Sequence, residues 1–111
     1  MTPEEEDDIA RRLVTLDWWE WRPGMRDGCT YSRYPSDQMG GYGGGWPDLR
    51  DDATAGCLLA MLRERWEATE AKYTGKCWLI WLHDGSGWFD GGRSTYLGVA
   101  AARALLAVHD G

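Results

Sequence analysis

The sequence predicts an α+β fold: a small three-layer α/β/α sandwich whose short, mostly antiparallel sheet is covered by helices. Two observations support this prediction. The stretch "PDLRDDATAGCLLAMLRERWEAT" has the apolar spacing of a helix that buries one face. The stretch "KCWLIWLH" is apolar at every position from Cys77 to Leu82, which is typical of a strand covered on both faces. The expected order of elements is α-β-α-β-β-α in a single domain, residues 1–111.

The first predicted element is an N-terminal helix over residues 1–17. Thr2 is a suitable N-cap, Pro3 suits the first helical position, and Glu5 completes a capping box. One apolar stripe follows at spacings of four and three, formed by Ile9, Leu13 and Leu16.

An aromatic and glycine-rich segment, residues 18–46, comes next. Its start, "DWWEWRPG", predicts a short strand, with a frayed continuation of the helix as the alternative. From Met25 to Trp46 no period is visible, so we expect a long irregular loop with a short hairpin around residues 29–34. Loops of this length are uncommon in compact domains unless they are functional or mobile.

Residues 47–111 predict the order α-β-β-α. Asp51 is the expected N-cap of the central helix, and Gly56 inside that helix predicts close packing against another backbone. The buried face is predicted to be Ala55, Leu58, Leu59, Leu62 and Trp66.

The predicted hairpin and last helix complete this part of the chain. "DGSG" predicts a tight turn after the apolar strand, and "WFDGG" the returning strand. Ser94 or Thr95 caps the last helix, whose many alanines indicate close packing. Its expected buried stripe is Leu97, Ala101, Ala104, Leu105 and Val108.

Charge and cysteine content exclude several classes of protein. The net charge of −6 comes largely from the acidic run 4–8, which is expected to be a solvated first helical turn. The remainder has no basic stripe, so nucleic-acid binding is not expected. Cys29, Cys57 and Cys77 form no CxxC or Cys/His cluster, so we predict free buried thiols, no metal site and a reducing cytoplasm. Neither a signal peptide nor a membrane span is expected.

The glycine stretch "MGGYGGGWPDLRDD" does not match a phosphate-binding loop. The GxGxxG template meets Trp46 where it requires glycine, and no GK[ST] follows. Asp48, Asp51 and Asp52 would repel an anion from the following helix. We therefore expect a flexible or tightly turned loop, with ordering on contact with a partner as the functional alternative.

No catalytic motif is recognisable, and no cofactor is expected. His83 and Asp84 stand at the end of the predicted strand, with Asp90 across the hairpin, but no nucleophile motif accompanies them. A histidine that caps the turn is the expected role, and binding is favoured over enzymatic activity.

Aromatic residues are the strongest anomaly, with eight Trp and five Tyr in 111 residues. Trp, Tyr and Arg dominate binding hot spots, and they also stack on bases or sugars. The alternative is that a small domain uses Trp because each one buries a large area. The candidate contact residues are Trp18, Trp19, Trp21, Arg22, Arg26, Tyr31, Tyr34, Tyr42, Trp46, Trp88 and Arg93.

The stretches "WEWRPGMRDG" and "PDLRDDATAGCLLAMLRERW" resemble small bacteriophage and prophage proteins of unknown function, of the phage ABA-sandwich type. The resemblance implies a phage accessory protein acting in the bacterial cytoplasm by binding, and in one form inhibiting, a host protein involved in defence. It implies no catalytic residue. Two alternatives stay open: a protein that stacks a nucleotide or similar ring on Trp and Arg, and a structural protein that self-assembles as a homo-oligomer.

Overall fold

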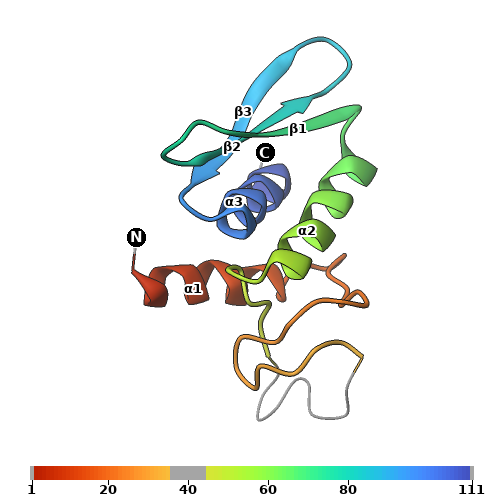
Figure 1. Cartoon of the computed structure of the whole chain (residues 1–111). Coiled ribbons are helices and arrows are strands. Elements are labelled where there is room, and N and C mark those ends of the chain that lie inside the picture. Colours follow the sequence, from red (N-terminus) through yellow and green to blue (C-terminus); the bar gives the residue numbers. More distant parts are fainter. Residues whose placement is uncertain (1, 36–44, 111) are drawn as a thin grey trace.

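The computed structural model describes residues 2–35 and 45–110, and these form three helices and one three-stranded sheet in the order α-α-β-β-β-α (Figure 1). The α+β class is confirmed. The elements are α1 (Pro3–Leu13), α2 (Asp52–Arg65), β1 (Ala68–Tyr73), β2 (Trp78–His83), β3 (Trp88–Ser94) and α3 (Leu97–Asp110).

Both predicted helix starts are confirmed by their caps. Thr2 accepts a hydrogen bond from the Glu5 backbone N–H at 3.2 Å, and Pro3 opens α1. Asp51 accepts one from the Thr54 backbone N–H at 3.0 Å and opens α2. These side chains satisfy N–H groups that have no partner within the helix, which fixes where each helix begins.

The sheet is antiparallel throughout, with strand order β1-β2-β3. The predicted hairpin between β2 and β3 is confirmed: the Asp84 carboxylate accepts hydrogen bonds from the backbone N–H groups of Ser86 and Gly87. These bonds hold the pKa of Asp84 below its ordinary value. A β-bulge shifts the register between β2 and β3: Ile80 lies opposite Gly92, whereas its neighbour Trp81 lies opposite Asp90.

Two strand predictions need correction. No strand forms at residues 18–21. The alternative, a frayed continuation of the helix, fits better: the chain beyond Leu13 makes successive turns, in which the Leu16 N–H bonds to the Leu13 carbonyl at 3.1 Å and the Trp19 N–H to the Leu16 carbonyl at 3.0 Å. The missing strand is β1, which the sequence assigned partly to the central helix. That helix ends at Trp66, whose backbone is extended, and the chain continues directly into β1.

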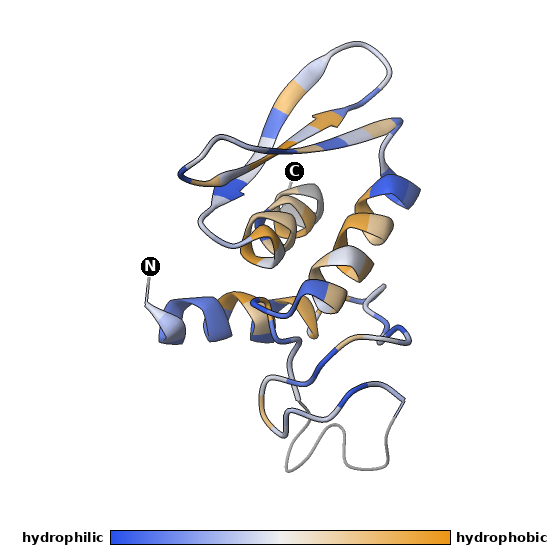
Figure 2. Ribbon diagram, in the orientation of Figure 1, coloured by the Kyte–Doolittle hydropathy of each residue, from blue (hydrophilic) through white to orange (hydrophobic). Residues whose placement is uncertain are grey.

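Helix α3 is the centre of the molecule. It contacts β2 and β3 on one side, α2 beside it and α1 on another side (Figures 1 and 2). Residues 99–102 and 104–106 are buried, so this helix is apolar nearly all round. Ile80 and Leu82 of β2 are fully buried against it. The predicted close packing of the alanines is confirmed, because a Cβ on Gly92 would lie 2.6 Å from the Ala100 carbonyl oxygen.

The predicted α/β/α layering is not confirmed. Figure 1 draws the three helices on the same side of the sheet, with α3 next to it and α1 farther away. Ile80 and Leu82 point toward α3, whereas their neighbours Leu79 and Trp81 are outside the core cluster. Among residues 2–35 and 45–110, no helix covers this second face.

Three smaller expectations are also corrected or tested. Gly56 is exposed, and a Cβ there would have no neighbour within 4 Å, so the predicted close packing is wrong. The three cysteines are free, but Cys29 is exposed and Cys57 and Cys77 are only partly buried. In the part of the chain that the structure describes, none of the helices combines the length and the apolarity that a membrane span requires.

Candidate functional site

The candidate contact residues divide between two places. Trp88 and Arg93 lie on β3. The other described candidates belong to residues 18–35 and 45–46, which Figure 1 draws on the far side of the helices from the sheet. Tyr42 lies outside the described residues. The structure therefore does not bring all of these residues into one site.

Most of the aromatic rings in the loop pack against the core. The members of this group are Trp18, Trp19, Trp21, Tyr34 and Trp46. Arginine side chains cover two of the rings, with Arg65 over Trp18 at 3.6 Å and Arg11 over Trp46 at 4.4 Å. These rings mainly stabilise the fold, and only part of their surface is accessible to a partner.

Arg22 fastens the loop to the central helix. Its guanidinium donates to both carboxylate oxygens of Glu64 on α2 and also contacts Glu20. The hydrogen bonds that Arg22 donates to Glu64 raise the pKa of Arg22 above its ordinary value. Arg22 is thus a structural residue of the loop.

The buried carboxylate of Asp27 organises the next turn of the loop. Asp27 is 0% exposed and accepts hydrogen bonds from the Cys29 N–H at 2.8 Å and the Thr30 hydroxyl at 3.2 Å. Its backbone carbonyl accepts from the Tyr31 N–H at 2.8 Å. A Cβ on Gly45 would lie 2.3 Å from an Asp27 carboxylate oxygen, so only glycine fits beside it. A short hairpin forms here as predicted, but it spans residues 24–34 rather than 29–34, with a bridge between Arg26 and Arg33.

Tyr31 is the residue that this turn presents to solvent. Its side chain is 63% exposed, and its backbone has a φ of 60°, in the left-handed region that bulky residues rarely adopt. The Arg26 guanidinium lies 4.9 Å from the ring centre. The position therefore combines an exposed aromatic ring with an unfavourable backbone conformation that the surrounding hydrogen bonds maintain.

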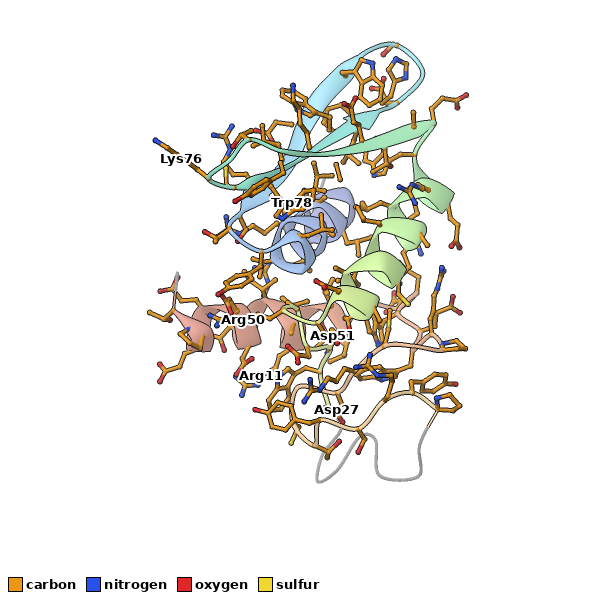
Figure 3. The ribbon with its side chains drawn as sticks, in the orientation of Figure 1. Arg11, Asp27, Arg50, Asp51, Lys76 and Trp78 are labelled. Carbon is orange, nitrogen blue, oxygen red and sulfur yellow. The ribbon has the colours of Figure 1, made fainter. Side chains whose placement is uncertain are left out.

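A cleft of 310 Å³ lies beside Tyr31. It is lined by Pro3, Glu6, Asp7, Gly28, Tyr31, Asp48, Leu49 and Arg50. We call Tyr31 together with this cleft the Tyr31 surface. Figure 3 shows Arg50 next to α1 and Asp27 in the loop below it.

The wall of the cleft is held by an ion pair that the sequence did not predict. The Arg50 guanidinium donates two hydrogen bonds to the buried Glu6 carboxylate, at 2.7 and 3.1 Å. Arg50 also lies over the Tyr96 ring at 4.3 Å. Glu6 belongs to the acidic run that was expected to be a solvated helical turn, so its burial corrects that expectation. The ion pair was not predictable because Glu6 and Arg50 are far apart in the sequence.

His83 and Cys57, two described side chains of types that occur in catalysis, make local hydrogen bonds. His83 Nδ1 accepts the Gly85 N–H at 3.0 Å, which confirms the expected role at the hairpin turn. The Cys57 thiol donates to the Pro23 carbonyl, and burial raises its pKa, so it is a poor nucleophile. Among the side chains of residues 2–35 and 45–107, no group of His, Cys, Asp and Glu is arranged to hold a metal ion.

The second face of the sheet is a surface that the sequence did not predict. Trp81 and Leu79 lie at its centre on β2, and His83 contacts Trp88 edge-on with ring centres 5.0 Å apart. We call this surface the open face. It comprises Glu70, Lys72, Leu79, Trp81, His83, Trp88, Asp90 and Arg93. The all-apolar β2 pattern concealed it, because that pattern indicated cover on both sides.

Comparison of the chain with protein-family models, with curated proteins and with solved structures found no match.

Proposed function

We propose that this chain acts by binding another protein, and that Tyr31 is the centre of the contact. The observation that supports this is the unfavourable left-handed backbone beneath a tyrosine that is 63% exposed. Such a backbone conformation destabilises the fold by on the order of 1 kcal/mol. The exposed ring adds little packing with the core that could offset this cost. Tyrosine is enriched in binding hot spots because it offers a large, rigid, partly polar contact area.

The partner that fits the Tyr31 surface is a protein with a basic patch. Asp7 and Asp48 line the cleft, and Glu4 and Glu5 are exposed in the same turn of α1. Opposite charge on the partner would speed association and select the orientation of docking. Binding should therefore weaken as salt is added.

In the cell, we propose that the chain is a phage accessory protein that binds and disables a host protein, with inhibition of a defence protein as one form. The resemblance of "WEWRPGMRDG" and the α2 stretch to phage proteins supports this proposal. It requires a binding surface and no catalytic group.

A ring-shaped small ligand in the cleft is the second candidate. The volume of 310 Å³ is at the lower end for small-molecule sites, and Tyr31 lies in its lining. The lining holds three carboxylates, Glu6, Asp7 and Asp48, against one cation, Arg50, which is paired with Glu6. This negative balance disfavours a nucleotide because it would repel the phosphates. Titration with uncharged and cationic ring compounds, followed by tryptophan fluorescence, tests this alternative.

The test of the main proposal is affinity capture from a bacterial host, compared between matched variants. We expect Tyr31→Ala to abolish capture of a specific protein. The control is Tyr73→Ala, because Tyr73 is also exposed, at 55%, but lies on β1 away from the loop. Equal capture by wild type and Tyr31→Ala would refute the proposal, and so would equal loss in both variants.

A further inference from the structure

We infer that the open face is a self-association surface, on which a second copy of this chain docks with its own open face. This surface is separate from the Tyr31 surface, so the inference does not depend on the proposed function. It follows from three features of the face: its apolar centre, its charge pattern and its symmetry.

The apolar centre is accessible although it contains large side chains. Leu79 and Trp81 are only partly buried and do not belong to the core cluster, and Trp88 is 51% exposed. Trp78, by contrast, points to the core side, between the sheet and α3 (Figure 3). Adjacent apolar rings on an otherwise polar rim are typical of a protein-interaction surface.

The charged residues of the open face form two rows across the strands. In one row, Trp81 pairs with Glu70 on β1 and with Asp90 on β3, so its two ends are acidic. In the adjacent row, Leu79 pairs with Lys72 and Arg93, so its ends are basic. The face is therefore an acidic row beside a basic row, with no net charge from these four residues.

This pattern is complementary to itself under one particular two-fold rotation. An axis that crosses the strands between the two rows places β1 on β1 of the second copy and reverses the strand direction. Glu70 then meets Lys72 of the second copy. Asp90 and Arg93 already form an ion pair at 3.0 Å within each copy, and the rotation places the pair of one copy against the pair of the other, so the β1 residues carry most of the complementarity. An axis parallel to the strands would instead set acidic rows against each other. Closed dimers have such isologous contacts, and aligned sheets pack in this way.

The size of the open face predicts a weak dimer. Strands of this length span about 20 Å, and three of them cover about 14 Å in width. This footprint, about 280 Å² on each copy, is below that of standard specific interfaces, so we expect a weak, transient dimer with a dissociation constant on the order of 100 micromolar.

The test is sedimentation velocity of the purified chain over a range of concentrations, with charge variants on β1. We expect Lys72→Glu to weaken the dimer about ten-fold, because the change sets acid against Glu70 at two symmetry-related places. Adding Glu70→Lys to that variant restores the complementary pattern, and we expect it to recover most of the lost affinity. Trp88→Ala should weaken the dimer at least as much as Lys72→Glu.

Controls make the outcome decisive. Asp17→Lys changes the charge of an exposed residue that does not belong to the open face, and it should leave the dimer unchanged. Circular dichroism confirms that each variant folds. A wild-type chain that remains monomeric up to about 1 mM would overturn the inference. A double variant no tighter than Lys72→Glu alone would overturn the proposed symmetry, and with it the inference.

Discussion

Both terminal nitrogens of Arg33 donate hydrogen bonds to the carboxylate of Asp51, at 2.9 and 3.1 Å. Asp51 is also the N-cap of α2 and accepts hydrogen bonds from the Thr54 N–H and hydroxyl. Arg33 donates in addition to the Gly24 carbonyl at 2.8 Å. One carboxylate thus anchors the loop hairpin that presents Tyr31 and the start of the central helix.

This shared carboxylate predicts a pH dependence of stability. Hydrogen bonds from Arg33 hold the pKa of Asp51 below its ordinary value. Because the pKa is lower in the folded chain, the stabilisation is fully present above about pH 4 and is lost as the pH falls through the lowered value. Arg33→Ala should lower the free energy of unfolding at pH 7 and flatten its decline below about pH 4.

Urea denaturation followed by tryptophan fluorescence at neutral and acidic pH measures this effect. Arg63→Ala is the matched control, because Arg63 is an exposed arginine on α2 that is distant from Asp51 along the helix. An acid-induced loss of stability that is the same in Arg33→Ala as in wild type would contradict the prediction.

Gly56→Ala should stabilise the protein. Gly56 lies inside α2, is exposed, and has open space where a Cβ would stand. Alanine there reduces the freedom of the unfolded chain and adds no contact, so we expect a gain of about 0.5–1 kcal/mol in the free energy of unfolding. Thermal denaturation by circular dichroism measures it, and a decrease would show that the α2 surface is not free at this point.

Gly98→Ala should have the opposite effect, although it is the same chemical change in another helix. A Cβ on Gly98 would lie 2.0 Å from the Leu49 carbonyl oxygen, and neither atom belongs to a flexible side chain. The first turn of α3 would have to move away from the chain before α2, at a cost of about 1–3 kcal/mol. Comparison with Gly56→Ala in the same melting experiment separates close packing from helix propensity, and equal effects would refute the explanation.

The elements that the sequence predicted well are those with local signals. The starts of α1 and α2 were predictable because Thr2 and Asp51 have capping side chains followed by apolar periodicity. The β2–β3 hairpin was predictable because "DGSG" joins two strand-like stretches. In each case the information lies within a few residues.

The errors arose where distant residues decide the structure. Strand β1, with the sequence "ATEAKY", has little strand propensity and forms because it pairs with β2. Trp19 and Trp21 resembled a strand, but their rings contact each other edge-on and pack on the core from a turn. The same limit applies to the candidate site: the bonds of Asp27 and the pair between Glu6 and Arg50 depend on the folded chain.

Exchange of Tyr31 for asparagine should separate stability from function. Asparagine tolerates the left-handed backbone better than a bulky aromatic residue, so Tyr31→Asn should raise the free energy of unfolding by about 0.5–1 kcal/mol. The same variant lacks the exposed ring and should lose partner capture. A gain in stability together with a loss of binding is the expected result if the unfavourable conformation is retained because Tyr31 contacts a partner.

Urea denaturation and affinity capture on one preparation measure both effects. The control is Tyr34→Asn, at a partly buried tyrosine that packs on the core, and this variant should instead lose stability. Reduced stability in Tyr31→Asn would show that the ring supports the fold, and it would leave the exposed tyrosine without its proposed role.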